Sequence, residues 1–265
     1  MKKLLLSELY IYPVKSCKGV LRESLQVGLK GPEFDRRWMV VDSSGRFLSQ
    51  RILPQMAWIH TSLDERHLFL SAPSMVPLIV QRNPIGAPRK VIVWKDTCTA
   101  HDMGDQAADW LSQFLGMEVR LVFLPEDSVR KINPKYATTP EDQVSFADGF
   151  PFLLISEASL LDLNQRMGKS LRMNRFRPNL VISGCEPYEE DNWKRIRIGD
   201  IIFHFVKPCS RCIITNVDQE RAEKSNETLE ALSSYRKADG GIMFGQNLVH
   251  EGTGILQVGS EIEIL

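Results

Sequence analysis

Two cysteines three positions apart form the chain's most reactive stretch. Cys209 and Cys212 flank Ser210 and Arg211, with apolar runs before and after them. A Cys-x-x-Cys stretch suits a dithiol redox pair, half of a zinc site, or one thiolate that binds a soft metal. Burial alone is a fourth interpretation, because free cysteine is among the most buried residue types.

The rest of the sequence argues against two of these interpretations. A structural zinc site needs four ligands, and the chain has no second Cys-x-x-Cys and no His-x3–5-His. Thioredoxin-like pairs open a helix, whereas the β-branched residues 213–217 predict a strand. A single thiolate beside an arginine and plain burial both remain open.

Basic residues near strand ends are candidates for binding an anion. Lys15 and Ser16 follow a first predicted strand at 4–12. Arg175 and Arg177 alternate before another strand, so we expect both guanidinium groups to point the same way. Paired guanidiniums suit phosphate, although solvated surface arginines fit the pattern equally well.

Composition narrows the class of protein. The 265 residues predict one large or two small domains, and 43% apolar with 25% charged residues is ordinary for a globular protein. Lys plus Arg and Asp plus Glu both number 33, so no net field favours a nucleic acid polymer or an anionic membrane. Five widely spaced cysteines and the lack of a ~20-residue apolar stretch predict a cytoplasmic protein without membrane attachment.

The expected fold class is α+β, mainly β. Closely spaced short strands with turn residues between them predict a barrel-like first domain over 1–125, and 126–265 reads as a small β-barrel with helical insertions. Helices are expected at 105–115, 157–167 and 229–236. Ser156 is placed to cap the second helix, and glycines follow the first two.

Five motifs follow one another in a fixed order: Tyr12-Pro-Val-Lys-Ser-Cys17, Asp35-Arg36, Phe176-Arg-Pro-Asn179, Val181-Ile-Ser-Gly184 and Cys209-Ser-Arg-Cys-Ile213. Together they resemble those of the MOSC-domain proteins. The resemblance covers residues 3–265 and points to the branch of the mitochondrial amidoxime-reducing component and the bacterial hydroxylaminopurine-detoxifying proteins. It implies an N-terminal MOSC-associated β-barrel-like domain and a C-terminal MOSC β-barrel.

The same resemblance implies a molybdenum–molybdopterin cofactor between the two domains. Cys212 would be the catalytic residue and the thiolate ligand of molybdenum, a soft ligand for a metal that already carries dithiolene sulfur. The implied cofactor-binding residues are Lys15, Ser16, Arg36, Asp148, Arg177, Asn179, Ser210 and Arg211.

The implied activity is N-reductive detoxification, in which hydroxylaminopurines or amidoximes lose oxygen at molybdenum: R–NHOH plus two electrons and two protons gives R–NH2 plus water. The chain has no cysteine run for an iron–sulfur cluster, so electrons are expected from a separate ferredoxin, flavodoxin or similar reductase. One alternative is a non-catalytic module that binds or delivers the molybdenum cofactor. Another is a thiol protein in which Cys209 and Cys212 form a redox disulfide.

Overall fold

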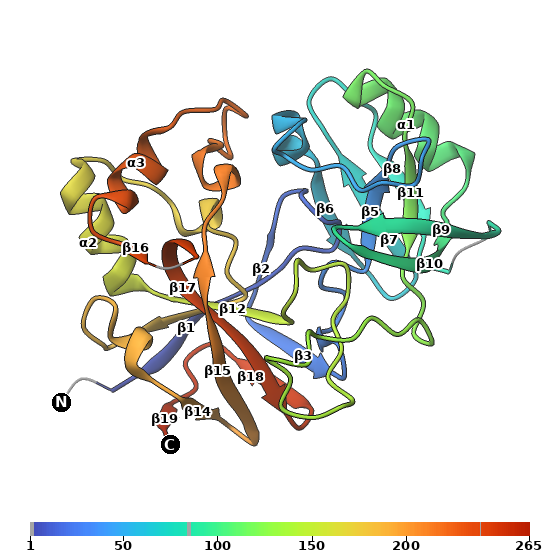
Figure 1. Ribbon diagram of the computed structural model, residues 1–265. Coiled ribbons are helices and arrows are strands. Elements are labelled where there is room, and N and C mark those ends of the chain that lie inside the picture. Colours follow the sequence, from blue (N-terminus) through green and yellow to red (C-terminus); the bar gives the residue numbers. More distant parts are fainter. Residues whose placement is uncertain (1–2, 84–85, 239) are drawn as a thin grey trace.

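The computed structural model describes residues 3–83, 86–238 and 240–265. These residues form many strands and three α-helices, arranged as two bodies that lie side by side (Figure 1). The expected α+β, mainly β class is therefore confirmed. The boundary at residues 125 and 126 stays a prediction.

The first body contains two antiparallel sheets and helix α1. Trp38, Leu111 and Leu121 belong to its apolar core, and Gly116 in the left-handed conformation ends the helix as expected. The sheet orders are β5-β11-β10-β9 and β6-β7-β8. The elements are β5 (Trp38–Val41), η1 (Pro54–Trp58), β6 (His60–Leu63), β7 (His67–Ser71), β8 (Leu78–Gln81), β9 (Pro88–Val93), β10 (Asp96–Asp102), α1 (Asp105–Leu115) and β11 (Arg120–Phe123).

The second body is built on a nine-stranded sheet in the order β19-β14-β15-β17-β12-β13-β1-β2, with β16 paired to β17. Phe152 and Phe203 pack edge to face at 5.0 Å in its core. Ser156 caps α2 by accepting from the Ser159 N–H, as expected. The elements are β12 (Phe152–Ser156), α2 (Glu157–Met167), η2 (Met173–Arg175), β13 (Leu180–Ser183), η3 (Glu189–Asn192), β14 (Arg195–Ile198), β15 (Ile201–Ser210), η4 (Ile213–Asn216), α3 (Glu227–Ser233), β16 (Lys237–Ala238), β17 (Gly241–Glu251) and β19 (Ile262–Ile264).

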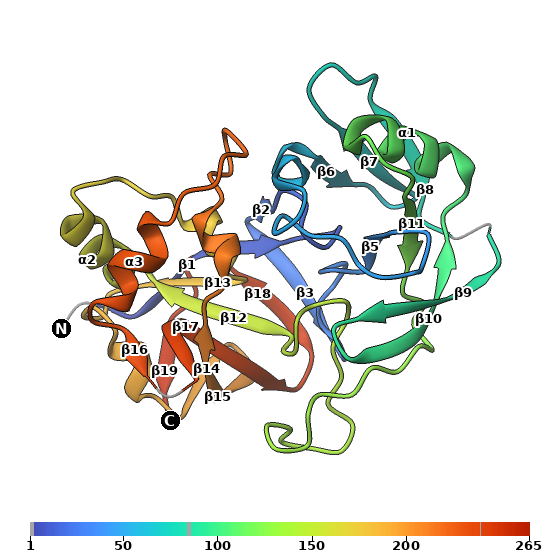
Figure 2. The same cartoon turned by 45° about the horizontal axis from the view of Figure 1, so that its top comes forward.

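The first strands of the chain pair with the second body. β1 is antiparallel to β13, and β3 is antiparallel to β18. Between β1 and β2, residues 12–19 run toward the first body and bond to its backbone. This segment therefore lies where the two bodies meet (Figure 2). The strands concerned are β1 (Leu5–Ile11), β2 (Val20–Arg22), β3 (Ser24–Gly28), β4 (Gly31–Pro32) and β18 (Gly254–Gln257).

Two local predictions were wrong. The expected strand at 213–217 is instead the 3-10 helix η4, because the Thr215 N–H and hydroxyl both donate to the Cys212 carbonyl and turn the chain. The third helix starts and ends earlier than the expected 229–236. At η4 the local hydrogen bonds override side-chain propensity.

Candidate functional site

A cavity of about 300 Å³ lies between the two bodies, and both contribute to its walls. Every site residue that the family resemblance implied lines it, although those residues come from five separate segments of the chain. The nine residues are Lys15, Ser16, Arg36, Asp148, Arg177, Asn179, Ser210, Arg211 and Cys212.

The two thiols of the cysteine motif have different cationic neighbours. Cys212 joins the end of β15 to η4, and Arg51 Nη2 donates to its Sγ at 3.1 Å. Arg211 Nη1 donates to Cys209 Sγ, also at 3.1 Å. Both cysteines are free thiols. Both cysteines line the cavity, and the Cys212 sulfur has a guanidinium from the other body beside it.

Arg51 lines the cavity but lies outside the motifs of the sequence, which by itself allows it either to line a site or to brace the barrel. Its guanidinium lies over the Trp94 ring at 4.4 Å, and Lys224 Nζ donates to its carbonyl at 2.7 Å. These contacts fix its direction toward Cys212. The spacing of neighbouring residues gives no signal for this role, because Arg51 and Cys212 are 161 positions apart.

Arg36 and Arg177 occupy adjacent positions on the cavity wall. Arg36 Nη1 donates to Asn179 Oδ1 at 3.1 Å and also pairs with the buried carboxylate of Asp35. Arg177 Nη1 donates to the Cys17 carbonyl at 2.7 Å. These bonds fix the direction of each guanidinium, and the Asp35 carboxylate balances the charge of Arg36.

Three cavity-lining residues have left-handed backbone conformations that are unfavourable for side chains other than glycine. The φ angles are +68° at Ser16, +49° at Arg36 and +58° at Arg177. Such conformations persist only where surrounding contacts hold them, and they concentrate at binding sites.

The prediction that Arg175 and Arg177 point the same way was wrong. Arg175 lies in η2 and pairs with Asp218 at 2.9 Å, whereas Arg177 lines the cavity. The left-handed turn at Arg177 breaks the strand-like alternation that the prediction assumed.

Lys15 brings a buried ammonium group to the cavity. Its Nζ donates to the Phe146 carbonyl at 2.7 Å and to Asp148 Oδ1 at 2.5 Å. Burial lowers the pKa of Lys15 from its ordinary 10.5 to about 8, although Asp148 opposes this change.

Asp148 is the acidic partner at the cavity edge. Burial acts to raise its pKa, but Lys15, Trp94 and Arg51 together hold the pKa well below its usual range. Trp94 Nε1 donates to Asp148 Oδ1 at 3.0 Å. The Asp148 side chain is 61% exposed, so water screens these attractions.

The residues present fit a phosphate-bearing group with a soft metal. The Nε of Arg211 is buried and has no hydrogen-bond partner within the described ranges, which leaves a donor for a ligand. The lining includes one carboxylate, Asp148, among the residues described, against six cations. The cations are Lys15, Arg36, Arg51, Arg177, Lys207 and Arg211.

Comparison with known proteins identifies the family of the chain. Residues 3–118 match the MOSC N-terminal beta barrel domain, and residues 141–263 match the MOSC domain. Human mitochondrial amidoxime-reducing component 1 is 38% identical over 98% of this chain and 82% of its own length. The chain belongs to the MOSC-domain family of the amidoxime-reducing components. The resemblance read from the sequence is confirmed.

Two further relatives show the range of this MOSC family. Mitochondrial amidoxime reducing component 2 of Rattus norvegicus is 35% identical over 97% of this chain and 82% of its own length. A molybdenum cofactor sulfurase of Oryza sativa subsp. japonica is 33% identical over 93% of this chain but only 32% of its own length. The names of these relatives refer to the reduction of amidoximes and to the molybdenum cofactor.

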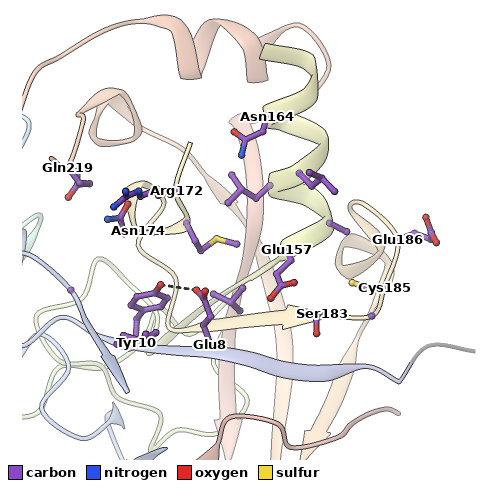
Figure 3. Close-up of a pocket in the computed structure, with 18 of the residues that line it drawn as sticks. Glu8, Tyr10, Glu157, Asn164, Arg172, Asn174, Ser183, Cys185, Glu186 and Gln219 are labelled. Atoms are coloured by element: carbon purple, nitrogen blue, oxygen red, sulfur yellow. Dashed lines mark hydrogen bonds between the residues drawn. The ribbon is translucent and has the colours of Figure 1, made fainter. Parts of the chain in front are cut away.

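A larger cavity, of about 820 Å³, lies beside α2 and β13 (Figure 3). Its walls carry the carboxylates of Glu8 and Glu157, and Tyr10 donates to Glu8 Oε2 at 2.8 Å. Its thiol, Cys185, has a pKa raised to about 11, first by burial and then by Glu190. Its lining in the described residues has two cations, Lys18 and Arg172, against the three carboxylates of Glu8, Glu157 and Glu186. The smaller cavity, with six cations and two cysteines, is therefore the better candidate for binding an anionic cofactor.

None of the helices in the described ranges is both long enough and apolar enough to span a membrane.

Proposed function

We propose that this MOSC protein is a molybdenum cofactor-dependent reductase of N-hydroxylated compounds such as hydroxylaminopurines and amidoximes. One observation supports the proposal above the others. A single cavity gathers Cys212, Arg51 and five more cationic side chains from two bodies. The names of the human and rat relatives supply the substrate class.

In this proposal Cys212 binds molybdenum, and Ser210 holds the cofactor beside it. Lys15, Ser16, Arg36, Arg177 and Asn179 bind the phosphate side of the pterin, with Arg211 and Asp148 completing the walls. When bound, the molybdenum cofactor supplies the two-electron chemistry that removes oxygen from nitrogen.

The chain's own residues orient and charge the site. Lys15 Nζ, with a pKa of about 8, carries its proton at neutral pH and adds a positive charge to the buried wall. Arg51 directs an N–H at Cys212 Sγ from the opposite body, which sets the position of the sulfur.

Electrons would come from a separate carrier of the ferredoxin, flavodoxin or similar reductase class. The cytoplasm remains our proposed compartment, although the human and rat relatives carry mitochondrial names.

The deciding experiment measures molybdenum and pterin in purified wild type, Cys212→Ala and Cys209→Ser. We expect near-stoichiometric molybdenum in wild type and Cys209→Ser, and its loss in Cys212→Ala. The loaded protein should then reduce an aromatic amidoxime with a chemically reduced viologen. Molybdenum retained in Cys212→Ala, or lost only in Cys209→Ser, would contradict the assigned ligand.

A non-catalytic cofactor carrier is the second candidate. The molybdenum cofactor sulfurase relative favours it, because that match also covers most of this chain. A fully loaded protein that reduces neither hydroxylamines nor amidoximes, yet transfers its cofactor to a cofactor-free enzyme, would support the carrier over the reductase.

A further inference from the structure

Tyr12 is fully buried and contacts both arginines of the cavity wall. The guanidinium carbons of Arg36 and Arg177 each lie over its ring, 4.2 Å from the centroid. Two positively charged guanidinium groups therefore pack against the same tyrosine ring. The ring's negative face attracts each cation, and this attraction strengthens where water is excluded.

The rest of Tyr12 binds the two segments that carry these arginines. Its N–H donates to Asp35 Oδ1 at 2.8 Å, and its carbonyl accepts from the Arg36 N–H at 2.9 Å. Its hydroxyl donates to the Pro178 carbonyl at 2.9 Å, one position after Arg177. One residue therefore fixes both segments through its backbone and its side chain.

These contacts act at two strained positions. Arg36 and Arg177 both have left-handed backbones, which need support from their surroundings. Burial lowers the pKa of Arg177 to about 10, so this cation is held at an energetic disadvantage that the Tyr12 ring offsets. Burial also raises the pKa of Tyr12 above its usual value, which keeps the ring neutral.

We propose that Tyr12 is a positioning residue that holds Arg36 and Arg177 as a paired clamp for a phosphate dianion. The identity of the natural ligand, the phosphate-bearing pterin, rests on the proposed function. The clamp itself is a property of the cofactor-free chain, because every contact described above lies within it.

The test titrates inorganic pyrophosphate into the full-length, cofactor-free protein by calorimetry at constant ionic strength. Wild type and Tyr12→Phe should bind within about threefold of each other, because phenylalanine keeps the ring. Tyr12→Leu should bind at least about tenfold more weakly, since losing 1.4 kcal/mol gives a factor of ten. Potassium chloride at matched ionic strength should give no binding signal.

Tyr10→Leu is the matched control. Tyr10 stacks on Tyr12 at 6.4 Å but lines the larger cavity and has no cation–π contact with either arginine in the described part of the chain. Its pyrophosphate affinity should equal that of wild type. A tenfold loss in this variant would show that general packing, not the Tyr12 ring, governs the site.

A second variant keeps the test decisive if Tyr12→Leu does not fold. Pentafluorophenylalanine at position 12 keeps the shape of the ring but removes its negative face. It should bind pyrophosphate at least fivefold more weakly than Tyr12→Phe. Equal affinities in these two variants, or a wild type that does not bind pyrophosphate, would overturn the proposal. Pyrophosphate binding without hydroxylamine reduction would instead leave the clamp intact and reject only the reductase.

Discussion

At the scale of single residues, the site depends on cations placed against specific partners. Arg51 donates a hydrogen bond to Cys212, Arg211 donates one to Cys209, and Lys15 donates one to Asp148. Arginine and lysine place their N–H donors differently. Replacing one of these arginines by another cation therefore does not preserve the contact.

Arg51→Met should reduce turnover of an N-hydroxylated substrate, per bound molybdenum, on the order of tenfold. The N–H bond to Cys212 Sγ is lost, and hydrogen bonds of charged groups contribute about 1.5–3 kcal/mol. Steady-state assays normalised to metal content measure the effect. Arg46→Met, at an exposed arginine of the same body, is the control and should leave turnover unchanged. Equal rates in both variants would remove Arg51 from the site.

Lys15 should make stability depend on pH. Below about pH 8 the ammonium is charged in both folded and unfolded chains; between pH 8 and 10.5 only the unfolded chain keeps the proton, so rising pH favours folding. Relative to Lys15→Met, the wild-type free energy of unfolding should therefore rise by about 2 kcal/mol from pH 7 to pH 10. Urea denaturation at both pH values tests this, and a constant difference would contradict the lowered pKa.

At the scale of elements, the cavity floor depends on close contact between β12 and β17. Gly245 in β17 has a φ of +81°. A Cβ there would lie 2.8 Å from the Leu154 carbonyl oxygen and 2.6 Å from Ile155 Cγ1. Only glycine allows this approach, and β17 in turn pairs with β15, which leads to the cysteine motif.

Gly245→Ala should lower the free energy of unfolding by about 2–4 kcal/mol, because it combines backbone strain with a clash against a neighbouring strand. Chemical denaturation of the two proteins gives the value. Gly28→Ala is the control, since nothing lies within 4 Å of the added Cβ, and it should change stability by no more than about 0.5 kcal/mol. Similar losses at both positions would argue against the contact.

At the scale of the whole molecule, the site exists only where the two bodies meet. Gln50 and Gln219 exchange hydrogen bonds of 3.2 and 2.9 Å across this junction, and both are buried. Trp58 Nε1 adds a bond of 2.8 Å to the Glu220 carbonyl. These contacts hold the segment that carries Gln50 and Arg51 against the segment after η4.

A double-mutant cycle tests the junction. Gln50→Ala and Gln219→Ala should each cost about 1–3 kcal/mol, because each leaves a buried amide without its partner. The double variant should cost about 1 kcal/mol less than the sum. Strict additivity of the unfolding free energies would show that the two amides do not interact.

The sequence by itself determined the parts of this MOSC protein that depend on local patterns. Helices α1 and α2 follow from apolar periodicity, a serine cap and glycine ends, since each helix satisfies its backbone within its own segment. The family resemblance likewise selected nine of the residues that line the cavity, because it attaches to short contiguous stretches.

Only the tertiary structure decided what depends on residues far apart in the chain. It placed Arg51 against Cys212, sent Arg175 to Asp218, and put Tyr12 beside two arginines, one of them 165 positions away (177 − 12). Local hydrogen bonds to the Cys212 carbonyl also formed a 3-10 helix at residues 213–216 against their β-branched composition. Non-local hydrogen bonds, cation–π contacts and left-handed backbones carry no sequence period, so only the folded chain shows them.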